Sequence, residues 1–307
     1  MESNPNLPKV SIITPSYNQG EFIERTILSV LGQDYPNLEY MVFDGASRDD
    51  TQRVLKRYNA YIDRIVSEKD NGQADALNRG FQHCKGEILA YINSDDCYAS
   101  KTVISRAVQY FQAHPEVDVI CGQRYFIDEN GYFHFCYPTR PFSKADLYLS
   151  CYIFQECTFW RKSIYDKAGG YIDDTFRFAM DYELWLRFLK VGATFLAVDD
   201  VFGLFRSYDN QKSIAQWQQS GLPEIERVYK QYCDRCLPEE EMVNAYLEHF
   251  YRVNPAKNFE HYRLAFDLWN TLVLSKKNIL TLPIDTWGLD ADIRHRRKAG
   301  ILQQLSR

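Results

Sequence analysis

Short apolar runs alternate with amphipathic segments along the first third of the chain. The apolar runs cover 10–14, 38–43, 62–67 and 88–92, and each is followed by polar or turn-forming residues, which is typical of buried strands. Between them, the spacing of apolar residues and the helix-capping residues predict helices over 21–33, 49–58 and 74–84. Because single helices separate the strands, the pattern predicts an α/β fold with a doubly wound, mainly parallel sheet and helices on both faces.

The pattern loosens in the middle of the chain. It predicts a strand over 117–121, a hairpin within 122–135 that turns at 128–131, a helix over 182–190 and a strand over 194–198. From about residue 211 the sequence is largely helical, with aromatic residues at helical spacing that are more typical of a core than of a cofactor site.

Charge and cysteine usage narrow the classes of function. A formal net charge of -5 argues against a groove for nucleic acid, although a metal ion can let an acidic cleft hold a diphosphate. The eight cysteines follow a polar N-terminus without a signal peptide, so we expect reduced thiols in the cytoplasm. Cys233 and Cys236 form a single C-x-x-C without a second pair at the spacing of a zinc site. Two thiols on a helix are therefore favoured over zinc ligands. No segment approaches the roughly 18 apolar residues that span a bilayer.

Four polar clusters follow the four predicted strands. They are Pro15-Ser16-Tyr17-Asn18, Asp44-Gly45-Ala46-Ser47, Asp70-Asn71-Gly72-Gln73 and Asn93-Ser94-Asp95-Asp96. In an open parallel sheet, ligands bind beyond the carboxyl ends of the strands. We therefore expect these clusters to converge on one crevice, which is the candidate active site.

Two adjacent carboxylates, Asp95 and Asp96, follow the fourth strand. They repel each other, and a cation would relieve that repulsion. Mg²⁺ and Mn²⁺ prefer one or two carboxylates together with substrate phosphate oxygens. The alternative is that the pair caps a helix starting near Ser100, and the sequence leaves both interpretations open.

Other polar residues also admit a ligand-binding and a structural interpretation. Asp44 is favoured as a contact to a nucleobase or ribose, whereas Ser47 can simply cap the following helix. The ring of Tyr17 can stack on a base or pack structurally. Asp70 opens a helix whose N-terminus favours an anion, and it can equally cap that helix itself. Asp181, at another helix start, is by its position more often a cap than a base.

Six stretches together resemble glycosyltransferase family 2, an inverting family with the GT-A fold. They are VSIITPSYN at 10–18, VFDGASRDDT at 42–51, EKDNGQADALNRG at 68–80, GEILAYINSDD at 86–96, CTFWRKSIYDKAGGYID at 157–173 and AMDYELWLRF at 179–188. The resemblance covers residues 8–210, which we predict to be the nucleotide-sugar-binding and catalytic domain. Residues 211–307 are then a helical C-terminal extension that packs over the cleft.

The resemblance implies a role for each cluster. The residues that it places at the nucleotide and donor are Pro15, Tyr17, Asn18, Asp44, Ser47, Asp70, Gln73, Asn78, Arg79, Asn93, Ser94 and Asp95. Asp95 and Asp96 would hold Mg²⁺ or Mn²⁺. Asp181 would be the catalytic base, with Glu183 as a substitute that should face elsewhere on the helix.

The implied reaction is a single inverting displacement. Asp181 would deprotonate the acceptor hydroxyl while the metal stabilises the departing nucleotide diphosphate, with a UDP-sugar favoured as donor. The acceptor would be a saccharide or lipid-linked saccharide in cell-surface polysaccharide or glycolipid assembly. The protein would then be cytoplasmic, with at most peripheral contact at the inner face of the cell membrane. The basic run 294–298 can touch anionic lipids or form a solvated face.

Three departures from the family pattern qualify this reading. Asn93 stands where many relatives have the first Asp of D-x-D, Tyr208 stands where many have a His, and the Q-x-x-R-W motif of processive synthases is missing. A single-addition enzyme is therefore favoured over a polymer synthase. The alternatives are a nucleotidyltransferase on a similar sheet and a non-catalytic module that binds a nucleotide sugar.

Overall fold

The computed structural model describes residues 7–136, 141–149, 151–208 and 211–232. The chain divides into two compact units, one that ends at Ala215 and one that begins at Gln216. The described part of the second unit consists of a π-helix, Trp217–Gly221, and α9, Leu222–Tyr232. The predicted extension beyond residue 232, with its C-x-x-C and its basic run, lies outside the described residues.

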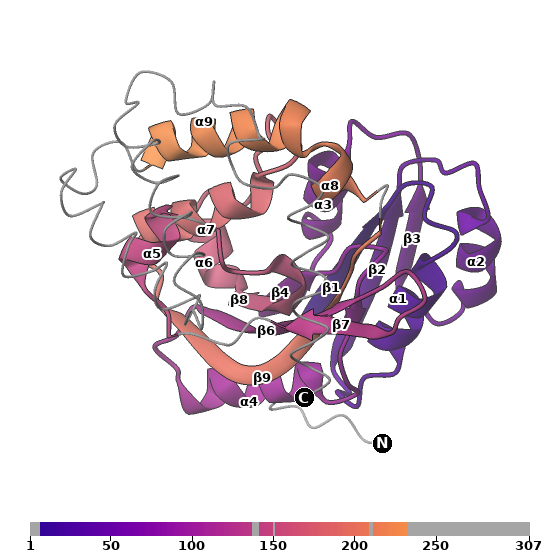
Figure 1. The fold of residues 1–307 in the computed structure, drawn as a ribbon. Coiled ribbons are helices and arrows are strands. Elements are labelled where there is room, and N and C mark those ends of the chain that lie inside the picture. Colours follow the sequence, from indigo (N-terminus) through magenta and orange to yellow (C-terminus); the bar gives the residue numbers. More distant parts are fainter. Residues whose placement is uncertain (1–6, 137–140, 150, 209–210, 233–307) are drawn as a thin grey trace, which may run out of the picture. The chain divides into compact units, whose positions relative to one another are not determined.

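The N-terminal half of the first unit is a parallel α/β sheet. Its strands are β1 (Val10–Ser16), β2 (Leu38–Asp44), β3 (Arg64–Ser67) and β4 (Ile88–Tyr91), and its helices are α1 (Ile23–Leu31), α2 (Thr51–Tyr58) and α3 (Gln73–Phe81). The strands lie in the order β3-β2-β1-β4, and all three pairings are parallel. The chain therefore reverses direction across the sheet between β3 and β4, which puts α1 and α2 on one face and α3 on the other (Figure 1).

The second half of the unit extends the same sheet with mixed pairings. Its strands are β5 (Cys97–Tyr98), β6 (Val119–Ile127), β7 (Phe133–Cys136), β8 (Thr158–Arg161) and β9 (Phe195–Arg206). They continue the order as β4-β8-β6-β9-β5, with β7 paired to β6. Among the five pairings that involve these strands, the pairing of β6 with β9 is parallel and the other four are antiparallel. The predicted parallel, doubly wound arrangement thus describes the first four strands, and the complete sheet is mixed.

Helices of this half flank the extended sheet. They are α4 (Val103–Ala113), α5 (Lys144–Leu149), α6 (Lys162–Lys167), α7 (Met180–Lys190) and α8 (Lys212–Ala215), with a 3₁₀ turn at Gln155–Cys157. Trp185 of α7 and Trp160 of β8 are both fully buried, and their rings meet edge to face with centroids 5.5 Å apart. This contact anchors α7 on the sheet. None of the described helices is long and apolar enough to cross a membrane.

Two strands are longer than their local pattern indicates. The predicted strand over 194–198 is the start of β9, which continues to Arg206, and the run over 117–121 merges with the first strand of the hairpin to form β6. The turn is where the sequence places it: Asp128 accepts hydrogen bonds from the backbone N–H groups of Asn130 and Tyr132, each at 2.9 Å. Long-range pairing of β6 with β9 extends both strands beyond their local signals.

Candidate active site

The loops after β1 and β2 are tied together at the carboxyl ends of their strands. The backbone N–H of Asn18 donates to Ser47 Oγ at 2.7 Å, and Asn18 Oδ1 accepts from the N–H of Arg48 at 2.9 Å. Asn18 has a φ of 51°, a left-handed conformation that Asn tolerates better than most residues. Pro15 lies within β1, and Tyr17, next to Asn18, is 63% exposed at this edge of the sheet.

Asp44 at the end of β2 is buried among hydrogen-bond donors. Its carboxylate accepts from both the N–H and the hydroxyl of Ser47, from Gln52 Nε2 at 2.6 Å and from Ser67 Oγ at 2.6 Å. Sequence reasoning singled out neither Gln52 nor Ser67, because each reaches Asp44 only through the fold. The contact of Asp44 with a nucleobase stays a prediction.

Asp70 packs against the backbone of the loop after β2. A Cβ added to Gly45 would lie 2.9 Å from Asp70 Oδ2, so a larger residue at this position would have to displace the carboxylate. Asp70 Oδ1 also accepts from the N–H of Gly72 at 2.9 Å, but this bond does not cap α3, since Gly72 is itself the N-cap and the helix has no side-chain cap hydrogen bond. Burial raises the pKa of Asp70, and the neighbouring charge of Asp75 adds to that rise.

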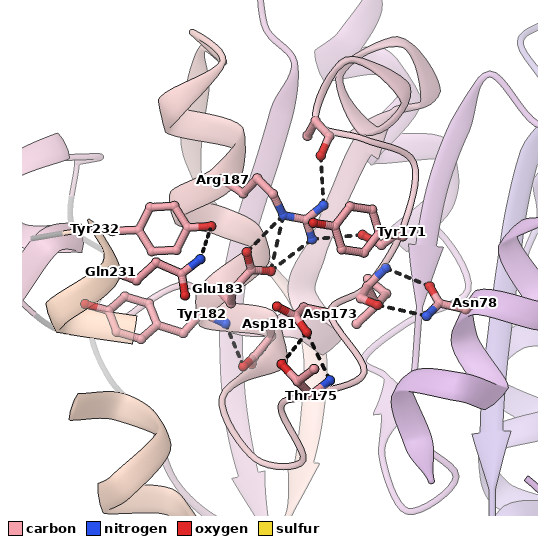
Figure 2. A network of polar contacts seen from close by, with 12 residues as sticks. Asn78, Tyr171, Asp173, Thr175, Asp181, Tyr182, Glu183, Arg187, Gln231 and Tyr232 are labelled. Carbon is pink, nitrogen blue, oxygen red and sulfur yellow. Dashed lines mark hydrogen bonds and ion pairs between the residues drawn. The ribbon is translucent and has the colours of Figure 1, made fainter. Parts of the chain in front are cut away.

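Asn78 and Arg79 of α3 make contacts inside the protein. The side chain of Asn78 exchanges two hydrogen bonds with the backbone of Ile172, at 2.7 and 2.8 Å, and so fixes the loop before α7 (Figure 2). Arg79 pairs with Asp75 at 2.8 Å, one turn earlier on the same helix. These contacts are structural, and a role of either residue at the donor stays a prediction.

The start of α3 is linked to the loop after β4 and to α8. Gln73 Nε2 donates to Asn93 Oδ1 at 2.6 Å, while Gln73 Oε1 accepts from Lys212 Nζ at 2.7 Å. Ser94, the next residue after Asn93, is buried. The structure thus brings together Gln73 and Asn93, as predicted from strand-end convergence, and adds Lys212, which sequence reasoning missed.

Asp95 and Asp96 have different surroundings. Asp95 Oδ2 accepts from the Tyr208 hydroxyl at 2.9 Å. Asp96 is fully buried, and its Oδ1 accepts from the backbone N–H of Arg206 at 3.0 Å. Burial raises the pKa of both carboxyls, and the nearby charges of Asp95 and Glu156 raise that of Asp96 further. Neither caps α4, whose N-cap is Thr102, so the helix-cap interpretation is wrong.

The residues present fit a divalent cation that is shared with a donor. Two adjacent carboxylates with pKa values raised by burial are the groups that a cation would stabilise in their charged form. Among the described residues, no group of three or more His, Cys, Asp and Glu side chains forms a preassembled metal site. Such a cation would take its remaining ligands from phosphate oxygens and water, as Mg²⁺ commonly does.

Arg206 holds the loop that carries these two carboxylates. Its Nε donates to the carbonyl of Asp95 at 2.9 Å, and its Nη1 donates to the carbonyls of Asp128 and Glu129 in the β6–β7 turn, both at 3.0 Å. The guanidinium also lies over the ring of Phe22 in the segment before α1. A side chain that is 1% exposed therefore joins the end of β9, the turn and the candidate metal loop.

A buried ion pair lies beside the same loop. Arg124 of β6 donates to both oxygens of Glu156, at 2.5 and 2.9 Å, and its guanidinium lies between the rings of Phe154 and Phe205. The negative charge of Glu156 contributes to the raised pKa of Asp95 and of Asp96. No local pattern marks the pair, since its members are 32 residues apart.

The first turn of α7 carries Asp181 and Glu183. Ala179 is the N-cap of the helix, so Asp181 lies within the first turn and does not cap it. Asp181 Oδ1 accepts from the N–H of Tyr182 at 2.8 Å. Burial raises the pKa of Asp181, while that hydrogen bond and the charges of Lys212 and Arg124 oppose the rise. A carboxylate with a raised pKa is a suitable general base.

Glu183 is engaged in the packing of α7. Its carboxylate is 1% exposed and accepts from Arg187 Nη2 at 2.9 Å and from Arg187 Nε at 3.0 Å. Arg187 also donates to the carbonyls of Ala168 and Tyr171, each at 2.8 Å (Figure 2). Glu183 therefore faces the contact between α7 and the segment after α6.

Comparisons with known sequences give a family and named relatives. The model of glycosyl transferase family 2 matches residues 11–168. An uncharacterized glycosyltransferase of Rickettsia typhi is 29% identical over 250 residues, which are 79% of this chain and 77% of that protein. The putative teichuronic acid biosynthesis glycosyltransferase TuaG of Bacillus subtilis is 39% identical over 92 residues, or 29% of this chain and 36% of TuaG.

Solved structures share the fold at low sequence identity. S. aureus TarS 1-349 in complex with UDP-GlcNAc matches with a TM-score of 0.62 and 17% identity, over 80% of this chain and 72% of that one. The mannosyltransferase PcManGT from Pyrobaculum calidifontis, in complex with GDP-Man and Mn²⁺, matches with a TM-score of 0.54 and 16% identity, over 90% and 85%. These likenesses show that the mixed sheet and its helices have the GT-A arrangement.

Proposed function

The chain belongs to glycosyltransferase family 2, and from this premise we propose that it moves a sugar from a nucleotide diphosphate sugar to an acceptor hydroxyl with inversion of the anomeric centre. A UDP-sugar is the favoured donor. TarS is named in complex with UDP-GlcNAc and PcManGT with GDP-Man, so the nucleobase is the first specificity to test.

The proposal rests on the position and the raised pKa of the Asp181 carboxylate. This carboxylate lies on the first turn of α7 with a pKa raised by burial, and it accepts a hydrogen bond from the N–H of Tyr182. Its remaining acceptor capacity suits a hydroxyl proton. Asp181 would take that proton while the acceptor oxygen bonds to the anomeric carbon and the bond from that carbon to the diphosphate breaks.

The donor side of the proposal rests on the strand-end loops. Tyr17, Asp44 and Asp70 line the carboxyl ends of β1, β2 and β3, where a nucleoside would lie in a sheet of this type. When bound, Mg²⁺ or Mn²⁺ supplies Lewis-acid stabilisation of the departing diphosphate, and Asp95 and Asp96 are the residues that would hold it. Tyr208 and Arg206 orient this pair through the contacts described above.

The acceptor is proposed from family analogy. TuaG is named for teichuronic acid biosynthesis, which supports a saccharide or lipid-linked saccharide in cell-surface polysaccharide assembly as the acceptor class. The proposed place of action is the cytoplasm, with peripheral contact at the inner face of the membrane.

The test is thermal unfolding with UDP-, GDP- and dTDP-sugars, with and without Mn²⁺. A ligand at about 100 times its Kd adds about 2.7 kcal/mol to the free energy of unfolding, which raises Tm by several degrees. We expect one nucleotide to do so in the presence of Mn²⁺, and the shift to disappear in Asp95→Ala. Asp50→Ala is the matched control, because Asp50 is an exposed residue that pairs with Arg53 on α2.

Three results would contradict the proposal. If no nucleotide sugar changes Tm in the wild-type protein, the donor site is wrong. If the protein instead releases pyrophosphate from a nucleoside triphosphate, it is a nucleotidyltransferase. A donor that binds tightly but is neither hydrolysed nor transferred to any acceptor would indicate a non-catalytic module.

A further inference from the structure

The carboxylate of Asp44 is already occupied by donors of the protein itself. It accepts two hydrogen bonds from Ser47, one from Gln52 and one from Ser67. A carboxylate offers about four lone-pair sites, so these four bonds fill its acceptor capacity. The residue is also only 2% exposed. A nucleobase can therefore reach Asp44 only if one of these donors leaves.

The hydrogen bonds of Gln52 determine which way its amide points. Nε2 donates to Asp44 Oδ2 at 2.6 Å and to Ser67 Oγ at 2.7 Å. A carboxylate oxygen only accepts, so the amide nitrogen and not the amide oxygen must face Asp44. Within the described part of the chain no group donates to Gln52 Oε1, and the residue is exposed. Its amide oxygen is thus an oriented acceptor that a ligand can use.

Gln52 belongs to the edge of the sheet that also carries the exposed ring of Tyr17. It lies in the first turn of α2, and the start of this helix is bonded to the loop after β1, because Thr51 Oγ1 accepts from the N–H of Gln19 at 3.0 Å. Tyr17 precedes Gln19 by two residues in that loop. A ring that can stack and an amide that can hydrogen-bond are the two kinds of group by which proteins recognise an unpaired base.

From this arrangement we infer that Gln52 selects the nucleobase of the donor, and that Asp44 is the positioning residue that holds its amide. The inference deepens the proposed function and rests on it. Gln52 Oε1 accepts a hydrogen bond from the ring N–H that uracil, thymine and guanine carry on their pairing edge. Cytosine and adenine have a lone pair at that position, which would face the lone pairs of Oε1. The donor class is therefore a diphosphate sugar of uridine, thymidine or guanosine.

The test compares two nucleotides that differ only in the base. Binding of UDP and of CDP (GDP and ADP if thermal unfolding selects guanine) is measured by calorimetry in Mn²⁺ buffer for wild type and Gln52→Met, which keeps the length of the side chain and removes the amide. We expect the wild-type protein to bind UDP at least about tenfold more tightly than CDP. Gln52→Met should bind UDP about fivefold more weakly, as for the loss of one hydrogen bond, and CDP within about twofold of wild type.

The sign of the change in UDP affinity separates two modes of base binding. If the base displaces the amide and binds Asp44 directly, Gln52→Met removes a competitor and UDP binds more tightly. Tighter or unchanged binding of UDP would therefore overturn the inference. Equal weakening of UDP and CDP would show a structural role of Gln52 and overturn it as well. The control is Gln82→Met, which changes an exposed glutamine at the C-terminal end of α3 and should leave both affinities unchanged.

The wild-type protein alone separates failure of the inference from failure of the proposed function. If it binds CDP or ADP more tightly than UDP and GDP, the donor site stands and base selection by Gln52 is wrong. If it binds none of these nucleotides, the proposed function itself fails, and the inference fails with it. Thermal unfolding of Gln52→Met without nucleotide checks that the variant folds, which we expect because Gln52 is exposed.

Discussion

Asp181 and Glu183 are two residues apart on the first turn of α7, and the protein surrounds them in opposite ways. Glu183 faces Arg187, whose guanidinium also donates to two backbone carbonyls. The charge of Glu183 is therefore neutralised by a partner that is itself held by hydrogen bonds. Among the described residues, the hydrogen-bond donor to the carboxylate of Asp181 is the N–H of Tyr182, and burial raises the pKa of this carboxyl. A compensated carboxylate stabilises a fold, whereas an under-compensated one retains reactivity.

The same contrast recurs across the sheet. Glu156 is paired with Arg124 and buried, while Asp96 accepts one backbone N–H, from Arg206, and a long contact of 3.4 Å from Gln155. Burial raises the pKa of Asp96 well above the usual value for an aspartate. We therefore expect the two carboxylates that pair with an arginine, Glu183 and Glu156, to govern stability. The carboxylates of Asp181 and Asp96 are expected to govern turnover.

The largest expected effect follows from Asp181→Asn. The amide cannot accept the acceptor's proton, so we expect kcat to fall about 10³-fold, within the usual range for loss of a general base. The affinity for the nucleotide sugar should stay within about twofold, since the substitution keeps the shape of the side chain. The measurement is steady-state kinetics with a confirmed acceptor, beside calorimetry of donor binding. Full activity in this variant would remove Asp181 as the base.

The second effect concerns stability and follows from Glu183→Gln. The substitution leaves the buried guanidinium of Arg187 without its anion, and breaking one partner of a buried pair typically costs about 3 kcal/mol. We expect urea unfolding to show a loss of this size, with donor affinity unchanged in the folded protein. Should the variant keep wild-type stability and lose turnover, Glu183 and not Asp181 would be the reactive residue of the turn.

The smallest expected effect is a gain in stability of Asp181→Asn at neutral pH. Burial raises the pKa of Asp181 above its ordinary value of 3.8, so the stability that its protonated form contributes is lost as the pH rises through the folded-state pKa. The uncharged Asn avoids that loss. We expect a slightly higher Tm than wild type at pH 7, with a difference that shrinks as the pH falls below the folded-state pKa and vanishes below the ordinary value of 3.8. A lower Tm at pH 7 would show that the charge of Asp181 is compensated.

The sequence predicted the parallel half of the fold well because its signals are local. Each strand there is a short apolar run that ends in polar residues, and the spacing of α1, α2 and α3 is set by neighbours within a turn. The same signals placed Asn18 and Ser47 together, since parallel strands end at one edge of the sheet. The family resemblance is likewise confirmed by the family model.

The surroundings of the candidate site could not be predicted in the same way. Tyr208 reaches Asp95 across 113 residues, and Lys212 reaches Gln73 across 139. No local pattern of apolar or polar residues predicts either contact, because each depends on where β9 and α8 lie in the folded protein. The contrast between Asp181 and Glu183 has the same origin: burial and pairing are properties of the folded state, and the two carboxylates look alike in sequence.

The hydrogen bonds of Arg206 to the β6–β7 turn affect which sequence changes the turn can tolerate. Arg206 binds the turn through the carbonyls of Asp128 and Glu129, and Arg25 adds a hydrogen bond to the carbonyl of Asn130 at 2.9 Å. Every amino acid supplies a carbonyl, so mutations at 129 and 130 can accumulate without loosening this attachment. Asp128 is the exception, since its side chain shapes the turn. The side chains at positions 129 and 130 of this hairpin can therefore change while the loop that carries Asp95 keeps its conformation.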